Sequence, residues 1–204
     1  MAKIGILGGT FNPIHLGHLL LAENAYDQLQ LDKVLIMPTG ISYLKEQSEV
    51  LPAKIRARMT EIAIEDNSHF EVSYIEINKE GNSYTADTLY SLKKEYPNDS
   101  LYFICGEDSL YGIDTWVRPQ DIFDNCILVV AKRTLSDNDT YDKMNETAGY
   151  LKRKYNAKIV FLNTPNMEIS SSDIRNRLAH NQSVKYYLPN KLIEYIKDSK
   201  YYNK

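Results

Sequence analysis

The chain alternates short apolar runs with longer amphipathic stretches, the order typical of strands and helices that follow one another. The apolar runs are rich in Ile, Val, Leu and Phe and show little polar alternation, as strands covered on both faces do. The pattern therefore predicts a parallel sheet with helices on both faces. Its expected strands are Lys3–Leu7, Lys33–Met37, Phe70–Val72, Leu101–Cys105, Ile127–Ala131 and Lys158–Leu162.

The intervening segments predict helices with recognisable ends. Ile55, Met59 and Ile62 fall on one face of a helix, and Pro97 would stop another just before it. Two stretches lack a clear period: Thr39–Leu51 is expected to be a mobile loop, and Tyr111–Pro119 is also loop-like. The expected helices are Gly17–Leu29, Ala53–Ile64, Thr85–Tyr96, Asp137–Tyr155, Ser171–His180 and Pro189–Lys197.

These elements predict an α/β fold with a doubly wound parallel sheet. We expect a single domain over residues 1–204, in which about 168–204 form a small helical C-terminal subdomain. In such sheets ligands bind at the carboxyl ends of the strands, near the point where the strand order reverses. The segments that directly follow the strands are therefore where chemistry is expected.

Composition narrows the class of partner. Charged residues make up 25% of the chain and its net charge is −3, so it lacks the basic excess usual in proteins that bind nucleic acid or a membrane surface. No apolar stretch approaches the roughly 20 residues that cross a bilayer, and no signal-peptide pattern is seen. We expect a cytoplasmic protein whose Cys105 and Cys126 are buried thiols, without a metal site built from its own residues.

A glycine-rich turn follows the first expected strand. Gly8 and Gly9 allow a sharp turn and a close approach to a phosphate, and the chain then enters a helix whose N–H groups favour anions. His15 and His18 lie three residues apart, so we expect both imidazoles on one helical face, where they can donate hydrogen bonds to phosphate oxygens. A phosphate nearby would favour their protonated forms.

A second candidate anion site lies far downstream, in Ile169–Arg175. Its serines start a helix, and Arg175 lies one turn inside, where a planar cation can clamp a phosphate. Taken alone, such a segment is more often an ordinary capped helix with a surface arginine, since serine caps are common. Trp116, the only tryptophan, is open in the same way between core packing and stacking on a heteroaromatic ring.

The string G-x-F-x-P-x-H-x-G-H over Gly9–His18 resembles the nucleotidyltransferase superfamily that shares its HxGH motif with class I aminoacyl-tRNA synthetases. The I-S-S-S-x-x-R string over Ile169–Arg175 matches the superfamily's second phosphate motif. The resemblance implies a Rossmann-like fold and attack on the α-phosphorus of ATP with pyrophosphate leaving. It assigns ATP binding to Gly8, Gly9, Thr10, Phe11, His18, Gly106, Asp108, Ile169, Ser171 and Arg175.

Three further features resemble the bacterial nicotinate-nucleotide adenylyltransferases, from Lys3 to about Ile196: S-Y-T-x-D-T-L at Ser83–Leu89, G-x-D at Gly106–Asp108, and Trp116. The resemblance implies transfer of AMP from ATP to nicotinate mononucleotide in NAD biosynthesis, giving nicotinate adenine dinucleotide and pyrophosphate. It places the nicotinate carboxylate at Tyr84 and Thr85 and the pyridine ring on Trp116. Both substrates are small molecules.

The family's catalytic groups carry over as His15, His18, Lys45 and Arg175, with Ser171 and Arg175 on the β- and γ-phosphates. The chain departs from the family's usual Pro-Pro-His-Lys, because Ser42-Tyr43-Leu44 precedes Lys45. Lys45 is expected to contact nicotinate mononucleotide or the α-phosphate. Mg²⁺ is expected to arrive with ATP, and no covalent intermediate is expected.

Other functions remain open at this stage. A phosphopantetheine adenylyltransferase would lack S-Y-T-x-D-T-L, and a nicotinamide-mononucleotide enzyme would differ in the pocket that reads the acid. A redox enzyme is disfavoured by the missing G-x-G-x-x-G, and a non-catalytic nucleotide sensor by the two intact phosphate motifs. The sequence leaves open the oligomeric state, with a homodimer as one alternative, the strictness of acid over amide, the path of the 39–51 loop and the kinetic constants.

Overall fold

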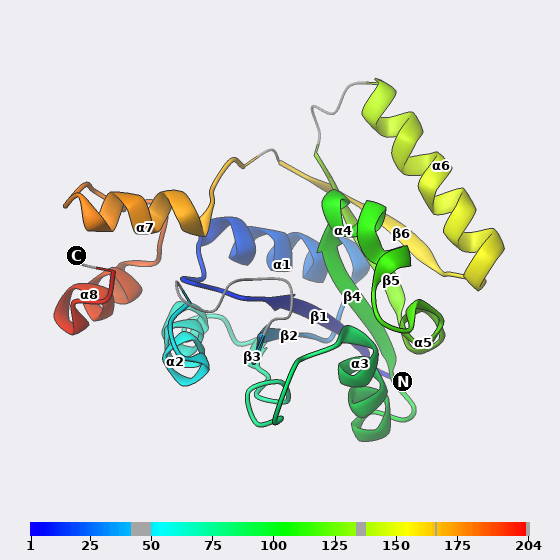
Figure 1. The fold of residues 1–204 in the computed structure, drawn as a ribbon, viewed down its shortest axis with the longest axis horizontal. Coiled ribbons are helices and arrows are strands. Elements are labelled where there is room, and N and C mark those ends of the chain that lie inside the picture. Colours follow the sequence, from blue (N-terminus) through cyan, green and yellow to red (C-terminus); the bar gives the residue numbers. More distant parts are fainter. Residues whose placement is uncertain (42–49, 134–137, 166, 203–204) are drawn as a thin grey trace.

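The sheet is the centre of the molecule (Figure 1). The computed structural model describes residues 1–41, 50–133, 138–165 and 167–202. All its strand pairs are parallel, in the order β3-β2-β1-β4-β5-β6. The strands are β1 (Lys3–Gly9), β2 (Lys33–Pro38), β3 (Phe70–Val72), β4 (Ser100–Gly106), β5 (Ile127–Arg133) and β6 (Ile159–Thr164).

Helices connect the strands and cover both faces of the sheet (Figure 1). The strand order reverses beside β1, which pairs with β2 on one side and with β4 on the other. The carboxyl end of β1 is therefore the switch point. The helices are α1 (Leu16–Leu29), α2 (Ala53–Ile64), α3 (Thr85–Glu95), α4 (Glu107–Gly112), the 3₁₀ helix η2 (Ile113–Thr115), α5 (Pro119–Asn125), α6 (Asn138–Tyr155), α7 (Ser171–Ala179) and α8 (Asn190–Ser199).

Two apolar clusters form the core, one on each face of the sheet. Successive strand residues point to opposite faces, so Ile4 and Ile6 join the cluster that packs against α3, α4, α5 and α6. Leu7 joins the other cluster, which packs against α1 and α2. Burial on both faces explains why the strands read as continuous apolar runs.

Helices α7 and α8 share the second cluster with the sheet. Ile174 of α7 and Leu192 of α8 are fully buried there together with Leu7 of β1 and Met59 of α2. In Figure 1 these two helices lie at the end of the molecule opposite α6. The single domain with a helical C-terminal subdomain stays a proposal, which this shared packing supports.

The six expected strands and six expected helices are present, with ends shifted by a residue or two. The expectation that Tyr111–Pro119 is a loop holds for Trp116–Arg118 and was wrong for the rest, which contains the end of α4, all of η2 and the first residue of α5. These elements are too short to show a hydrophobic period, and buried Leu110 and Ile113 hold them against the core. Most of the expected Thr39–Leu51 loop lies outside the described residues.

Two other expectations concern burial and membrane spans. Cys105 and Cys126 are buried free thiols, as expected, and burial raises the pKa of Cys105 to about 12. In the part of the chain that the structure describes, no helix combines the length and apolarity that a membrane span requires.

Candidate active site

The loop between β1 and α1 turns at the switch point of the sheet. Phe11 has a left-handed backbone (φ 45°) and a buried side chain, and its ring lies against Gly9. A Cβ on Gly9 would come within 2.5 Å of that ring, so only glycine fits there. The Asn12–Pro13 peptide bond is cis. The turn at Gly9 and Phe11 leads the chain from β1 to the start of α1.

His15 and His18 form a stacked pair at the start of α1. His15 is the extended residue that precedes the helix (φ −144°), not a helical residue as expected, and His18 lies in the first turn. Their ring centroids are nevertheless 3.7 Å apart with 25° between planes. A Cβ on Gly17 would lie 3.1 Å from Nδ1 of His15, so the glycine between them gives the pair room.

The two imidazoles differ in environment. The backbone N–H of His15 donates to Nδ1 of His18 at 3.3 Å, which leaves Nε2 as the nitrogen through which a neutral His18 donates. His15 is buried, and Nδ1 has no hydrogen-bond partner among the described residues. Burial lowers the pKa of His15 to about 4, so its imidazole is neutral near pH 7 until an anion approaches.

This buried imidazole makes stability depend on pH. The folded-state pKa of about 4 lies below the ordinary 6.5, so the unfolded chain binds the extra proton. Titration of His15 therefore does not affect stability above pH 6.5 and destabilises the fold as pH falls towards 4, by on the order of 3 kcal/mol. In urea unfolding, the free energy of unfolding of the protein relative to that of His15→Gln should fall by about this amount between pH 7 and pH 4. Parallel curves for the two proteins would contradict a buried neutral His15.

The start of α7 is hydrogen-bonded directly to the first loop. Ser170 caps α7 by accepting from the N–H of Asp173 at 3.0 Å. Ser171 Oγ donates to the carbonyl of Pro13 at 2.8 Å, and Arg175 Nη1 donates to the carbonyl of Asn12 at 3.1 Å. Two segments more than 150 residues apart thus form one structural unit.

That unit encloses a cavity of about 700 Å³. The N-termini of α1 and α7 both contribute to its walls, and helix N-termini favour anions. Eight of the residues expected to bind ATP or to catalyse line it together: Gly9, Thr10, Phe11, His15, His18, Ile169, Ser171 and Arg175. The remaining lining is Asn12, Gly17, Val50, Met167, Ser170 and Ser172.

A smaller cavity of about 170 Å³ adjoins the first, because Gly17 and Met167 line both. Gly106 and Asp108, at the carboxyl end of β4, line this second cavity. The two cavities together run from α7, past the histidine pair, to the end of β4. An elongated ligand with a polyanionic end and a sugar would fit along this track.

The residues expected to bind the acceptor lie apart from these cavities. Tyr84 and Thr85 are at the N-terminus of α3, where Tyr84 is the residue before the helix and Thr85 its first residue. The ring of Trp116 is half-buried and meets Phe103 of β4 edge-on, with centroids 6.4 Å apart. These residues belong to the α3 face of the sheet, whereas α1 and α7 belong to the other.

Gly8 lies between the residues that line the large cavity and the residues expected to bind the acceptor. It is in β1, one residue before Gly9, and a Cβ on it would contact Met37 and Phe103 on the α3 face. The residues are therefore grouped about the carboxyl end of β1, with the loop between β1 and α1 to one side and Trp116 to the other. Lys45 and Tyr43 fall within 42–49, outside the described residues.

Arg56 is a residue whose role was not anticipated from sequence. Its guanidinium is 2% exposed and donates to the carbonyls of Thr10, Thr39 and Gly40 at 2.6, 2.6 and 3.0 Å and to that of Leu51 at 2.8 Å. It therefore holds the loops after β1 and β2 and the start of α2 together. A signal was available, because Arg56 falls three residues before Met59 on the apolar face of α2.

Asn12 also organises the loop. Its Oδ1 accepts from the hydroxyl of Tyr202 at 2.7 Å and from the N–H of Leu51 at 3.4 Å, and burial raises the pKa of Tyr202 above its usual value. No sequence pattern marks Tyr202, which reaches the site only through the fold. Within the described ranges, no three His, Cys, Asp or Glu side chains gather as metal ligands.

The family model and the curated relatives that match this chain agree with one another. The model of the family described as cytidylyltransferase-like matches residues 6–177. A probable nicotinate-nucleotide adenylyltransferase of Lachnoclostridium phytofermentans is 44% identical over 196 residues, which is 96% of each chain. One of Clostridium botulinum is 41% identical over 203 residues, 99% of this chain and 98% of its own.

Solved structures share the fold. The Plasmodium falciparum nicotinic acid mononucleotide adenylyltransferase complexed with NaAD superposes with a TM-score of 0.77, covering 99% of this chain and 98% of its own. The same protein complexed with APC gives a TM-score of 0.75 over the same shares. Both are 20% identical to this chain, so the likeness is one of fold.

Proposed function

This chain belongs to the nicotinate-nucleotide adenylyltransferases, within the cytidylyltransferase-like family, and we propose that it transfers AMP from ATP to nicotinate mononucleotide in NAD biosynthesis. The products are nicotinate adenine dinucleotide and pyrophosphate. The observation that carries the proposal is the cavity of about 700 Å³ that the His15–His18 pair and the N-terminus of α7 line together. The names of the similar proteins, nicotinate-nucleotide and nicotinic acid mononucleotide adenylyltransferases, agree with this substrate.

ATP is proposed to lie along the two joined cavities. Its β- and γ-phosphates would meet the N-terminus of α7 and Arg175, where N–H groups and a guanidinium favour oxyanions. The adenosine would extend past Gly17 to Gly106 and Asp108, whose carboxylate is exposed at the end of β4. This orientation leaves the α-phosphate beside the histidine pair.

Nicotinate mononucleotide is proposed to lie across the carboxyl end of β1, on the α3 side. The N-terminal N–H groups of α3 would receive its carboxylate at Tyr84 and Thr85. Its pyridine ring would stack on the face of Trp116, because the edge-on contact with Phe103 leaves the indole half-exposed. Lys45 is proposed, from the family resemblance, to contact the mononucleotide or the α-phosphate.

The proposed reaction is an in-line displacement. An oxygen of the 5′-phosphate of nicotinate mononucleotide forms a bond to the α-phosphorus, and the bond from that phosphorus to the bridging oxygen of pyrophosphate breaks. The attacking phosphate is already anionic near neutral pH, with a second pKa of about 6, so no strong base is needed. His15 and His18 would donate hydrogen bonds to oxygens that gain charge in the transition state.

Nucleotidyltransferases of this kind generally use a divalent metal with ATP, and Mg²⁺ is the ion proposed here. Magnesium prefers phosphate oxygens and water and seldom needs a protein cage. The lining of the large cavity supports this arrangement, since its charged and polar side chains are imidazole, hydroxyl, amide and guanidinium rather than carboxylate. Mg²⁺ is therefore proposed to enter the site bound to ATP.

Pyrophosphate release tests the proposal. The protein is incubated with Mg²⁺ and ATP together with nicotinate mononucleotide, nicotinamide mononucleotide or phosphopantetheine, and pyrophosphate is measured. Release with nicotinate mononucleotide is expected at a rate well above that with the other two compounds. Faster release with phosphopantetheine would replace this function with that of a sister enzyme, and ATP binding without release would indicate a nucleotide sensor.

Trp116→Ala tests the acceptor half of the site. Loss of the stacking surface should raise KM for nicotinate mononucleotide by about threefold to tenfold, the range that aromatic pairs contribute, while KM for ATP stays within about twofold. Trp116→Phe keeps an aromatic face, so its KM for nicotinate mononucleotide should fall between those of the parent protein and of Trp116→Ala. An unchanged KM in Trp116→Ala would assign Trp116 to core packing alone.

A further inference from the structure

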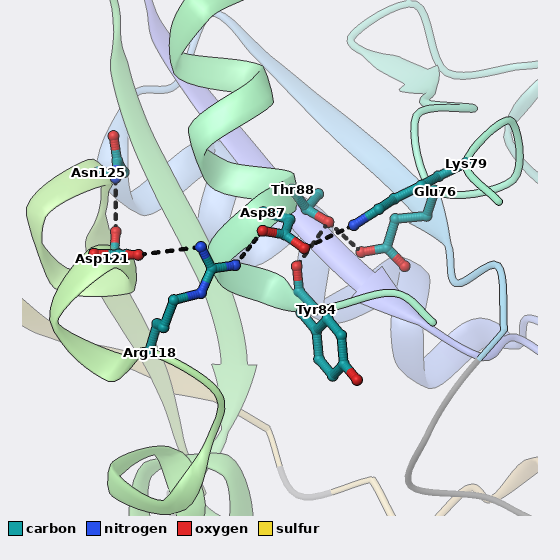
Figure 2. A network of polar contacts seen from close by, with 8 residues as sticks. All are labelled: Glu76, Lys79, Tyr84, Asp87, Thr88, Arg118, Asp121 and Asn125. Carbon is teal, nitrogen blue, oxygen red and sulfur yellow. Dashed lines mark hydrogen bonds and ion pairs between the residues drawn. The ribbon is translucent and has the colours of Figure 1, made fainter. Parts of the chain in front are cut away.

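A network of charged and polar side chains connects the start of α3 with the segment before α5 (Figure 2). Asp87, in the first turn of α3, forms an ion pair with Arg118 and another with Lys79 at 2.8 Å. Arg118 also approaches Asp121 of α5 at 3.5 Å. Asp87 and Arg118 carry no assigned role in binding, although Asp87 is the aspartate of the S-Y-T-x-D-T-L string.

The Asp87–Arg118 pair joins two elements that carry different parts of the acceptor site. Asp87 follows Thr85 by two residues in the first turn of α3. Arg118 follows Trp116 by two residues and is the residue before α5. Its backbone is left-handed (φ 53°, ψ 63°), a conformation that residues other than glycine adopt uncommonly. This backbone turn and the ion pair together fix the short segment that holds the indole.

The first turn of α3 is also held from its other side. Thr88 Oγ1 donates to Oε1 of Glu76 at 2.9 Å (Figure 2). Glu76 is 6% exposed, and burial raises the pKa of its carboxyl. The start of α3 is thus fixed in two directions: Thr88 ties it to the preceding loop, and Asp87 ties it to the Trp116 segment.

We propose that the Asp87–Arg118 ion pair is a positioning element for the acceptor, which sets the distance between the N-terminus of α3 and the face of Trp116. Neither side chain contacts substrate. A nicotinate ring carries its carboxylate at a fixed distance, so the two surfaces that receive them must keep a fixed spacing as well. This inference rests on the proposed function, because it concerns binding of nicotinate mononucleotide.

The pair is suited to testing because its loss should leave the fold intact. The side chains of Arg118 and Asp87 are 52% and 34% exposed, and exposed ion pairs contribute little to stability. Arg118→Gln and Asp87→Asn are each expected to raise KM for nicotinate mononucleotide by about threefold to tenfold, with KM for ATP within about twofold. The double variant should be no worse than either single variant, because both remove the same contact.

Lys79→Gln is the matched control. Like Arg118→Gln it removes one positive charge from Asp87, but it leaves the tie between α3 and the Trp116 segment intact. If only the positive charge beside Asp87 mattered, Lys79→Gln and Arg118→Gln would raise KM for nicotinate mononucleotide equally. The positioning role predicts that Lys79→Gln stays within about twofold of the parent protein.

Trp116 gives a second, direct readout, because it is the only tryptophan in the chain. Titration of each variant with nicotinate mononucleotide, followed by tryptophan fluorescence, should require higher ligand concentrations in Arg118→Gln and Asp87→Asn than in Lys79→Gln. Equal titrations in all proteins would overturn the proposal, as would multiplicative effects in the double variant. If the parent protein released no pyrophosphate with nicotinate mononucleotide, the proposed function would fail first, independently of these comparisons.

Discussion

Replacing His18 by alanine is expected to lower kcat by about 100-fold to 1000-fold, the usual effect of removing one hydrogen-bond donor to a developing oxyanion. Binding of nicotinate mononucleotide should change by less than about twofold, because its proposed contacts lie on the α3 side of the sheet. His18 stacks on His15 with ring centroids 3.7 Å apart and lines the large cavity. The loss therefore falls on the transition state rather than on the acceptor.

Steady-state kinetics and equilibrium titration of Trp116 fluorescence separate these two quantities. His18→Gln serves as the comparison, since its amide can still donate a hydrogen bond from a similar position and should retain more activity than His18→Ala. A His18→Ala protein with kcat within about twofold of the parent would remove His18 from the mechanism. A large loss of acceptor binding would move its role to the ground state.

Replacing Arg56 by leucine is expected to lower the free energy of unfolding by about 3 kcal/mol or more, since four backbone carbonyls, one buried and three partly buried, lose their donor at once. Those carbonyls belong to Thr10, Thr39, Gly40 and Leu51. Burial lowers the pKa of Arg56, but the guanidinium stays charged at neutral pH because its ordinary pKa is above 12. Arg56→Lys keeps the charge but not the planar fork, so a smaller loss is expected.

Urea unfolding measures this effect, and Arg58→Leu on the same helix provides the control. The Arg58 side chain is 58% exposed and pairs only with nearby Glu61 among the described residues, so its replacement should change stability by less than about 1 kcal/mol. Equal stabilities for Arg56→Leu and Arg58→Leu would contradict the structural role of Arg56. Because Thr10 lines the large cavity in which ATP is proposed to bind, Arg56→Leu should also raise KM for ATP.

The fold was largely predictable because burial of a strand or helix shows in the pattern of apolar residues along its own sequence. β1 and β4 are covered on both faces, so their sequences are continuous apolar runs that can be read without knowing what covers them. Helices α4 and η2 left no such trace, since six and three residues are too few to show a period. Their position depends on packing of Leu110 and Ile113 against distant strands.

The arrangement of the candidate site could be predicted where a motif is local and not where the fold assembles it. The His-x-Gly-His spacing predicts two imidazoles close together, but not that the ring of His15 is buried. The two phosphate motifs were recognised separately, and only tertiary structure joins them through Ser171 and Arg175. The hydrogen bond of Tyr202 to Asn12 spans 190 residues and leaves no sequence pattern at all.

In the proposed reaction the acceptor attacks the α-phosphorus of ATP. Parallel reactions with ATP labelled with ³²P at the α or the γ position, each with nicotinate mononucleotide and Mg²⁺, distinguish this from attack at another phosphorus. The α label is expected in nicotinate adenine dinucleotide and the γ label in pyrophosphate. Recovery of the γ label in the pyridine nucleotide, or of the α label in free AMP with none in a dinucleotide, would contradict it.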